Sequence, residues 1–189
     1  RVVLKYSEKL NRTFVLENFK DDSGSEFLPS QSSAFIDLDQ DLYPDLWLTT
    51  TNGYEVWLAQ NNQWIHKDTV KFPEGVSAQD VRQSSFADTD QDGIMDHIVA
   101  VCKGEGCTDS KIYIYNQGNW SRAMDGISIA KDEVWDFAPA EGDGIASYPV
   151  TLRIGDYNMD GFPDLITVIR SKDNIRKAVL FQNVPCALA

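Results

Sequence analysis

The sequence predicts an all-β protein built from repeated antiparallel sheets, and three observations predict it. The same acidic nine-residue loop occurs three times, starting at residues 37, 88 and 156. A short apolar run precedes each loop, at 34–36, 85–87 and 152–154. A β-branched run follows each loop, so every copy joins two predicted strands and marks one repeating unit.

Each unit continues with further strands. The runs after the loops lie at 46–49, 97–101 and 165–169, and third strands follow at 54–60, 111–116 and 177–182. A tryptophan strand then closes the first two units, at Trp64 and at Trp120. Four antiparallel strands per unit, with loop starts 51 and 68 residues apart, are typical of β-propeller blades.

The units predict a single propeller domain. We expect the end of a preceding blade at 1–33, a first blade at 34–70, a second at 71–122, an inter-blade insertion at 123–147 and a third, incomplete blade at 148–189. Since closed propellers have about 4–8 blades, we expect about three blades of a larger propeller, with the rest of that propeller as a partner.

The spacing of oxygen-bearing side chains within the loops predicts calcium sites. Positions 1, 3, 5 and 9 carry carboxylates or an amide, and position 7 would supply a backbone carbonyl, as a hard cation with about 6–8 oxygen ligands requires. The candidate ligands are Asp37, Asp39, Asp41, Tyr43 and Asp45; Asp88, Asp90, Asp92, Ile94 and Asp96; and Asp156, Asn158, Asp160, Phe162 and Asp164. Up to three Ca²⁺ ions are therefore expected.

Position 6 ranks the three loops. Gly93 and Gly161 permit a sharp bend there, whereas Leu42 must adopt it at a cost or use another geometry. The first site is therefore expected to be the weakest. An EF-hand is excluded, because position 12 is not Glu and strands rather than helices follow the loops. Three solvated acidic turns are the alternative, since Asp and Asn are common in turns.

The chain is acidic, with a formal net charge of −12. The loops carry four, four and three carboxylates, so three Ca²⁺ ions would bring the charge to −6. This acidity argues against nucleic-acid binding, which favours a basic surface. No run of apolar residues is long enough to span a membrane, and no signal peptide is visible.

The cysteines and two sequons favour an extracellular setting. Cys102 and Cys107 flank the turn of a predicted hairpin and can form a local disulfide, with free thiols as the alternative. Cys186 can pair with chain outside this segment. Asn11 and Asn119 begin Asn-x-Ser/Thr glycosylation patterns.

The sequence does not predict an enzyme. It has two histidines, of which His66 is expected at the surface, while His97 either faces outward or packs between sheets. Common nucleophile, metalloprotease and phosphate-binding motifs do not occur. The five tryptophans are mostly expected to pack between sheets, although one or two can belong to a partner surface; they are Trp47, Trp57, Trp64, Trp120 and Trp135.

The loops and their flanking strands closely resemble the FG-GAP repeat of integrin α-type propellers. Residues 86–88 and 154–156 resemble the entry to the repeat and 164–168 its exit, and the resemblance covers roughly residues 30–70, 80–122 and 148–184. Within this family, the loop at 155–164 is most similar to the T-cell immunomodulatory protein (linkin) group. That resemblance implies the extracellular ectodomain of a single-pass plasma-membrane protein.

The expected function is therefore a non-enzymatic, calcium-binding propeller segment that binds a protein partner at the cell surface, in cell adhesion and tissue integrity. The alternative is a calcium-stabilised propeller module attached to a secreted or surface enzyme, a lyase or a phospholipase, whose catalysis lies elsewhere.

Overall fold

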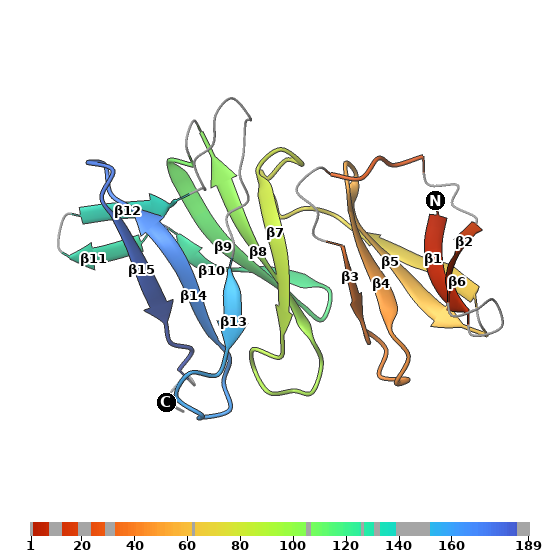
Figure 1. The fold of residues 1–189 in the computed structure, drawn as a ribbon. Coiled ribbons are helices and arrows are strands. Elements are labelled where there is room, and N and C mark those ends of the chain that lie inside the picture. The colour runs from red at the N-terminus through yellow and green to blue at the C-terminus, as the bar shows by residue number, and fades with distance from the viewer. Residues whose placement is uncertain are drawn as a thin grey trace.

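The computed structural model describes residues 2–7, 13–18, 24–28, 33–61, 63–104, 107–125, 127–130, 133–138 and 152–184. Within these ranges every regular element is a β-strand, which confirms the predicted all-β class. Three antiparallel sheets stand side by side, and a two-stranded hairpin lies next to the first of them (Figure 1). These sheets are the predicted blades.

In the first two blades, strands that are neighbours along the chain pair with each other. The hairpin consists of β1 (Val2–Ser7) and β2 (Thr13–Asn18). The first sheet contains β3 (Ala34–Ile36), β4 (Asp45–Thr50), β5 (Gly53–Gln60) and β6 (Gln63–Val70). The second contains β7 (Val81–Ala87), β8 (Asp96–Lys103), β9 (Asp109–Asn116) and β10 (Asn119–Asp125). The third contains β11 (Ile127–Ala130), β12 (Glu133–Phe137), β13 (Arg153–Gly155), β14 (Asp164–Arg170) and β15 (Arg176–Phe181). In this third blade, by contrast, both β12 and β13 pair with β14.

The strands that follow the acidic loops form the centre of each blade. All six residues of β4 are buried, as are seven of the eight in β8. By contrast, most residues of the outer strand β6 are exposed. The runs that follow the first two loops are thus strands buried on both faces, whereas Ile166 and Val168 of β14 are exposed.

Aromatic side chains fill the space between the first two blades. Trp47 packs edge-on against Phe86, with ring centroids 5.8 Å apart, and Tyr54 packs against Trp120 at 5.9 Å. His97 lies in the same cluster and is 2 % exposed. This confirms that Trp47 and Trp120 pack between sheets. It also shows that His97 packs between sheets and does not face outward. The side chain of Trp135 lies outside the described residues.

Aliphatic residues fill the space between the second and third blades. Ile98 and Ile112 of the second sheet share a core with Phe137 and Ile169 of the third, and each is at most 2 % exposed. The Ser85 hydroxyl also donates to the Leu152 carbonyl (3.1 Å) across this interface. The described parts of the three blades therefore pack as a continuous series.

In every blade the first strand pairs with the second strand at two equivalent positions. Its last residue before the loop pairs with position 9 of the loop, as Ile36–Asp45, Ala87–Asp96 and Gly155–Asp164. Five residues further along the second strand the pairs are Phe27–Thr50, Val81–Val101 and Phe137–Ile169. Between these pairs the first strand has a bulge in the second blade and longer interruptions in the other two.

This arrangement changes the predicted blade boundaries. The expected insertion covers 123–147, but β10 extends to Asp125 and β12 pairs with β14 in the third sheet. The pairing of β12 with β14 thus places residues before 148 in the third sheet. The first blade likewise begins before residue 34, at the Phe27 bridge.

Candidate metal sites

The three acidic loops occupy the same edge of the blades. They connect β3 to β4, β7 to β8 and β13 to β14, and all three lie at the lower edge of Figure 1. Each loop therefore joins the first two strands of its blade, in the place that the strand pattern predicts.

The loops also share their internal hydrogen bonds. The position-6 N–H donates to the first aspartate, as Leu42 to Asp37 (3.1 Å), Gly93 to Asp88 (2.8 Å) and Gly161 to Asp156 (2.8 Å). The position-7 N–H donates to position 5, as Tyr43 to Asp41 (2.8 Å), Ile94 to Asp92 (2.7 Å) and Phe162 to Asp160 (2.8 Å). These bonds fold each loop around its own carboxylates.

The position-6 residue adopts a left-handed backbone in all three loops. Gly93 and Gly161 have φ values of 88° and 89°, whereas Leu42 has 69°. Leu42 therefore adopts the same bend despite its side chain, at a conformational cost. In the second and third loops the position-5 N–H also donates to Oδ1 of the first aspartate, at 3.1 Å in both. In the first loop Asp37 Oδ1 is buried without a hydrogen-bond partner.

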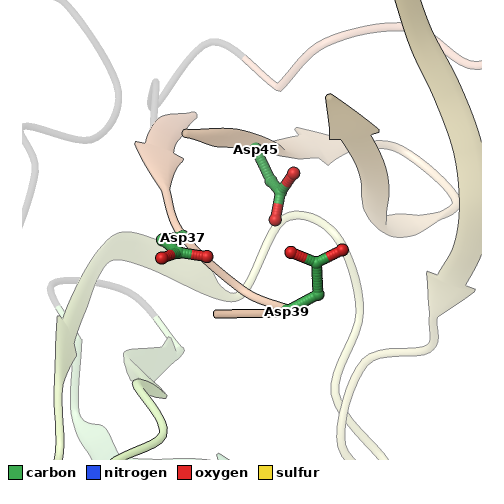
Figure 2. Close-up of side chains that lie close together, drawn as sticks. All are labelled: Asp37, Asp39 and Asp45. Atoms are coloured by element: carbon green, nitrogen blue, oxygen red, sulfur yellow. The ribbon is translucent and has the colours of Figure 1, made fainter. Parts of the chain in front are cut away.

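Carboxylates converge in the first two loops. Asp37, Asp39 and Asp45 each offer an oxygen, and these oxygens lie within 4.8 Å of one another (Figure 2). Asp88, Asp90 and Asp96 form the equivalent group in the second loop. Two ligands of one Ca²⁺ ion lie at most about 5 Å apart, since each is about 2.4 Å from the ion. Both groups therefore fit one such ion.

The unpartnered oxygen of Asp37 supports the same conclusion. A buried carboxylate oxygen without a hydrogen bond is unfavourable unless a cation balances it. Desolvation raises the pKa of Asp39, and the charges of the other three carboxylates in its loop raise it further. The neighbouring carboxylates therefore disfavour the charged form of Asp39.

Asp96 experiences the same effects in the second loop. Burial raises its pKa; hydrogen bonds from Thr89 oppose that rise, and the neighbouring Asp90 and Asp92 add to it. A bound divalent cation would remove this repulsion in either loop.

Positions 5 and 7 and the third loop complete the predicted set. Asp41 and Asp92 lie outside the two convergent groups. The third loop has the same backbone bonds, while the Asn158 amide donates to Asp160 Oδ2 (2.7 Å). The ligand roles of positions 5 and 7, and of the third loop, stay predictions.

Position 9 has a structural role that its spacing did not reveal. Asp45 and Asp164 are at most 1 % exposed. Asp45 accepts hydrogen bonds from the Leu38 N–H and from the Ala59 N–H, both at 2.9 Å. Asp164 accepts from Tyr157 (3.0 Å) and from Asn183 (2.9 Å). This aspartate therefore joins the loop to the third strand of its own blade.

Two amides beside the second loop were also missed in the sequence. Asn116 donates to Asp90 Oδ2 (2.9 Å), and Gln117 donates to Asp92 Oδ2. Both lie at the β9–β10 turn, 26 and 25 residues from the aspartates that they contact. Only the polar character of this turn hinted at such contacts.

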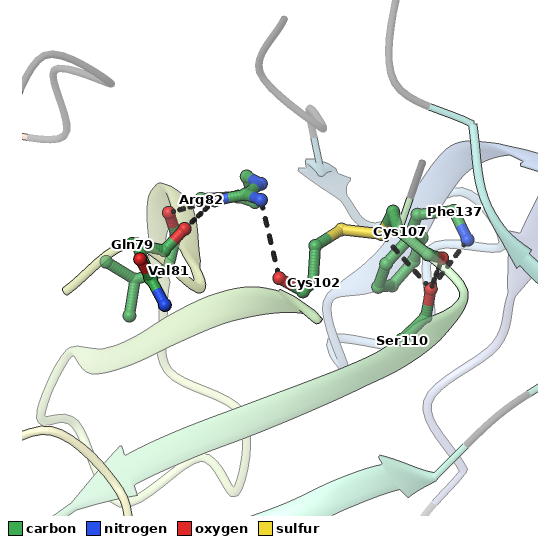
Figure 3. The surroundings of a disulfide bond; sticks show 7 residues. All are labelled: Gln79, Val81, Arg82, Cys102, Cys107, Ser110 and Phe137. Atoms are coloured by element: carbon green, nitrogen blue, oxygen red, sulfur yellow. Dashed lines mark hydrogen bonds between the residues drawn. A yellow bond between two sulfur atoms is a disulfide. The ribbon is translucent and has the colours of Figure 1, made fainter. Parts of the chain in front are cut away.

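A disulfide joins Cys102 and Cys107 at the opposite edge, as predicted (Figure 3). The adjacent Ser110 hydroxyl donates to the Cys107 carbonyl (3.2 Å) and accepts a hydrogen bond from the Phe137 N–H (2.9 Å). The bridged turn therefore holds the start of the third blade.

The remaining predicted residues fall in different places. Asn119 is exposed at the β9–β10 turn, and His66 is exposed on β6. Asn11 and Cys186 lie outside the described residues. Among the described residues no helix is long and apolar enough to cross a membrane.

Comparison with known proteins identifies the repeat. Residues 37–99 match the family described as FG-GAP-like repeat. Human T-cell immunomodulatory protein is 35% identical over 167 residues, covering 82% of this chain and 27% of the relative. The chain is an FG-GAP-repeat protein related to T-cell immunomodulatory protein.

Other relatives agree with this assignment. The rat T-cell immunomodulatory protein is 35% identical over 173 residues, covering 86% of this chain and 28% of the relative. Protein linkin of Caenorhabditis elegans is 24% identical over 168 residues, covering 84% of this chain and 26% of the relative. This FG-GAP chain spans little more than a quarter of the length of these relatives. No solved structure matches it.

Proposed function

We propose that this FG-GAP chain is an extracellular, calcium-binding propeller segment that binds a protein partner at the cell surface without catalysing a reaction. The carboxylate groups at the common loop edge carry the proposal, because two of them can each surround one cation. The equivalent backbone bonds of the third loop extend it to a third ion.

Calcium in these loops would act as a structural element. In the first loop Asp37, Asp39 and Asp45 would hold the ion, and in the second Asp88, Asp90 and Asp96 would hold it. An ion that binds only the folded chain stabilises it by mass action. It would thereby fix the junction between the first two strands of each blade.

Thermal unfolding with calcium and with EDTA tests this role. At a calcium concentration 100 times the dissociation constant, one site should add about 2.7 kcal/mol to the free energy of unfolding. Identical melting temperatures, together with no metal by elemental analysis, would exclude calcium binding.

Two matched substitutions test the ranking of the sites. Asp92→Ala and Asp41→Ala change equivalent position-5 residues in loops that differ at position 6. We expect Asp92→Ala to cause the larger loss of calcium-dependent stabilisation, because Leu42 weakens the first loop from the outset. Calorimetric calcium titration of both variants measures this difference, and a larger loss in Asp41→Ala would reverse the ranking.

The extracellular assignment rests on the disulfide and on Asn119. Disulfides persist in oxidising compartments, and the Asn119 side chain is exposed within its Asn-x-Ser pattern. We infer an ectodomain of a single-pass plasma-membrane protein. A mass decrease on enzymatic removal of N-glycans, absent in Asn119→Gln, tests modification at this site after expression in secretory cells.

The outer face of the third blade supports a larger propeller. Ile166, Val168 and Leu180 are 46 %, 43 % and 38 % exposed. Another blade would cover this apolar face. In a protein that contains the proposed further blade, Ile166→Lys should strongly destabilise the fold, whereas it should have little effect on the 189-residue chain. Equal effects in both proteins would contradict this packing.

A series of packed blades supports the proposal of binding to a protein at the cell surface. The fluorescently labelled longer protein should bind intact cells in calcium, and binding should fall in EDTA and after protease treatment of the cells. Binding that persists on protease-treated cells would exclude a protein partner.

A further inference from the structure

The position-4 side chain of each acidic loop is not part of the predicted ligand set. Gln40, Gln91 and Met159 occupy this position, and their φ values of 63°, 62° and 60° show that the backbone is the same in all three loops. Their side chains nevertheless differ in what they contact. The two glutamines reach the loop of the following blade.

Gln40 forms a direct bridge from the first loop to the second. Its Nε2 donates to the Gly93 carbonyl oxygen (2.9 Å), 53 residues further along the chain. The N–H of the same peptide group belongs to Ile94 and donates to Asp92 Oδ1 (2.7 Å). Since a peptide group is planar, Gln40 also fixes the direction of the N–H that holds Asp92.

Gln91 occupies the equivalent place between the second loop and the third. Its Nε2 would lie only 2.7 Å from a Cβ atom on Gly161, so the amide sits directly against position 6 of the third loop. A Cβ atom on Gly93 would lie 4.0 Å from Gln40 Nε2. Gly161 therefore serves two purposes, because it permits the bend and leaves room for the neighbouring amide, whereas a Cβ atom at Gly93 would make only an ordinary contact.

A second contact strengthens the connection between these two loops. Asn183, which follows β15, donates through Nδ2 to the Thr89 carbonyl (2.9 Å). The Asn183 N–H also donates to Asp164. Asn183 thus touches the second loop and the position-9 aspartate of the third.

We propose that Gln40 and Gln91 are positioning residues for the metal loop of the following blade: Gln40 for the loop at 88–96 and Gln91 for the loop at 156–164. The calcium affinity of the second and third loops then depends on a side chain from the preceding blade, and this dependence is the coupling between loops. This inference rests on the proposed calcium binding. Loss of one exposed neutral hydrogen bond changes an equilibrium about two- to tenfold.

Calcium titration of the full chain by amide NMR can separate the sites. The Leu42, Gly93 and Gly161 N–H groups each donate to the first aspartate of their own loop, so they report the three loops individually. Gln40→Ala should weaken calcium binding by the second loop, reported by the Gly93 N–H, about two- to tenfold. Calcium binding by the first loop, reported by the Leu42 N–H, should not change. Gln91→Ala should weaken calcium binding by the third loop, reported by the Gly161 N–H, while binding by the second loop is unchanged.

Met159→Ala is the matched control. Met159 has the same position and backbone as the glutamines and is 90% exposed. Its replacement should leave the affinities at Gly93 and Gly161 unchanged. If Gln40→Ala acts on its own loop alone, or no more strongly than Met159→Ala, the coupling is absent. If the unsubstituted chain shows no calcium response, calcium binding itself fails, and the coupling with it.

A double-substitution cycle gives an independent test. Gly161→Ala should weaken the third site partly because its methyl group displaces the Gln91 amide. In the Gln91→Ala background this part of the loss should disappear. Equal losses in the two backgrounds would show that Gln91 has no energetic contact with Gly161.

Discussion

The two ends of the first strand in each blade differ in how closely the repeats agree. At the loop end, position 9 pairs with the same strand position in all three blades, and the loop bonds are equivalent. Towards the other end, the strand has a bulge in the second blade and long interruptions in the first and third. Its outermost pair, such as Phe137–Ile169, is nevertheless retained.

The difference shows where the fold requires fixed geometry. The ligand oxygens of one ion must meet within a few ångströms, so one inserted residue would separate them. An interruption at the opposite edge needs only to return the chain to the second strand, and lengthening a loop costs little free energy. The regularity of the loop edge is therefore evidence for its chemistry.

The largest expected effect comes from removing the buried aspartate at the loop end. Asp164→Ala removes two hydrogen bonds to a carboxylate, from Tyr157 and Asn183. We expect a loss of about 3 kcal/mol in the free energy of unfolding, because each such bond contributes roughly 1.5–3 kcal/mol. Chemical denaturation in EDTA measures this effect without calcium.

Asp160→Ala is the control for this experiment. Asp160 is exposed and belongs to the same loop. Its replacement should cost less than about 1 kcal/mol in EDTA. If the two variants lost equal stability without calcium, position 9 would have no separate structural role.

At the opposite edge we expect a smaller and independent effect from the disulfide. Replacing Cys102 and Cys107 together with Ala should lower the free energy of unfolding by about 2 kcal/mol, as closure of a short loop predicts. The affinity of the acidic loops for calcium should not change. Denaturation and calcium titration of the same variant test both statements, and a parallel loss of affinity would show that the two edges are coupled.

The pH dependence of stability tests the packing around His97, which lies between the two edges. Burial lowers its pKa to about 3, below the usual value of about 6.5. Its contribution to stability is therefore complete above pH 6.5 and is lost as the pH falls towards 3. Between pH 7 and pH 5 we expect a loss of about 2 kcal/mol that is absent in His97→Phe.

Comparison of the unsubstituted protein with His97→Phe isolates the contribution of His97 to the pH dependence of stability. All other side chains are the same in both, so their contributions cancel in the difference between the two proteins. Denaturation in EDTA at several pH values provides the measurement. Stability curves that run parallel from pH 7 to pH 5 would show that His97 becomes protonated without unfolding the chain.

Local patterns predicted the blades and loops but not the contacts between distant segments. The loop spacing and the β-branched runs are short-range signals, and they located the strands beside the loops in all three sheets, whereas β11 and β12 fall in the range expected to be an insertion. The pairing of Phe137 with Ile169 was hidden because residues 139–151 separate β12 from the strand that it continues. The Gln40–Gly93 bond was also hidden, since nothing in the spacing of one loop specifies its neighbour.

The smallest expected effect comes from making the first loop like the other two. Leu42 is 90% exposed, so Leu42→Gly removes no buried surface. It removes a left-handed strain of about 1–2 kcal/mol, while the greater freedom of unfolded glycine costs roughly 0.5–1 kcal/mol. The net gain should be about 0.5 kcal/mol.

The substitution should also act on the binding geometry. Glycine can adopt the φ near 88° that is found in the second and third loops, where the position-5 N–H donates to the first aspartate. We therefore expect the Asp41 backbone N–H to donate to Asp37 Oδ1, which has no partner in the native loop. Slower hydrogen exchange of the Asp41 amide and tighter calcium binding at this loop would both follow. An unchanged calcium affinity would mean that Leu42 does not weaken the first site.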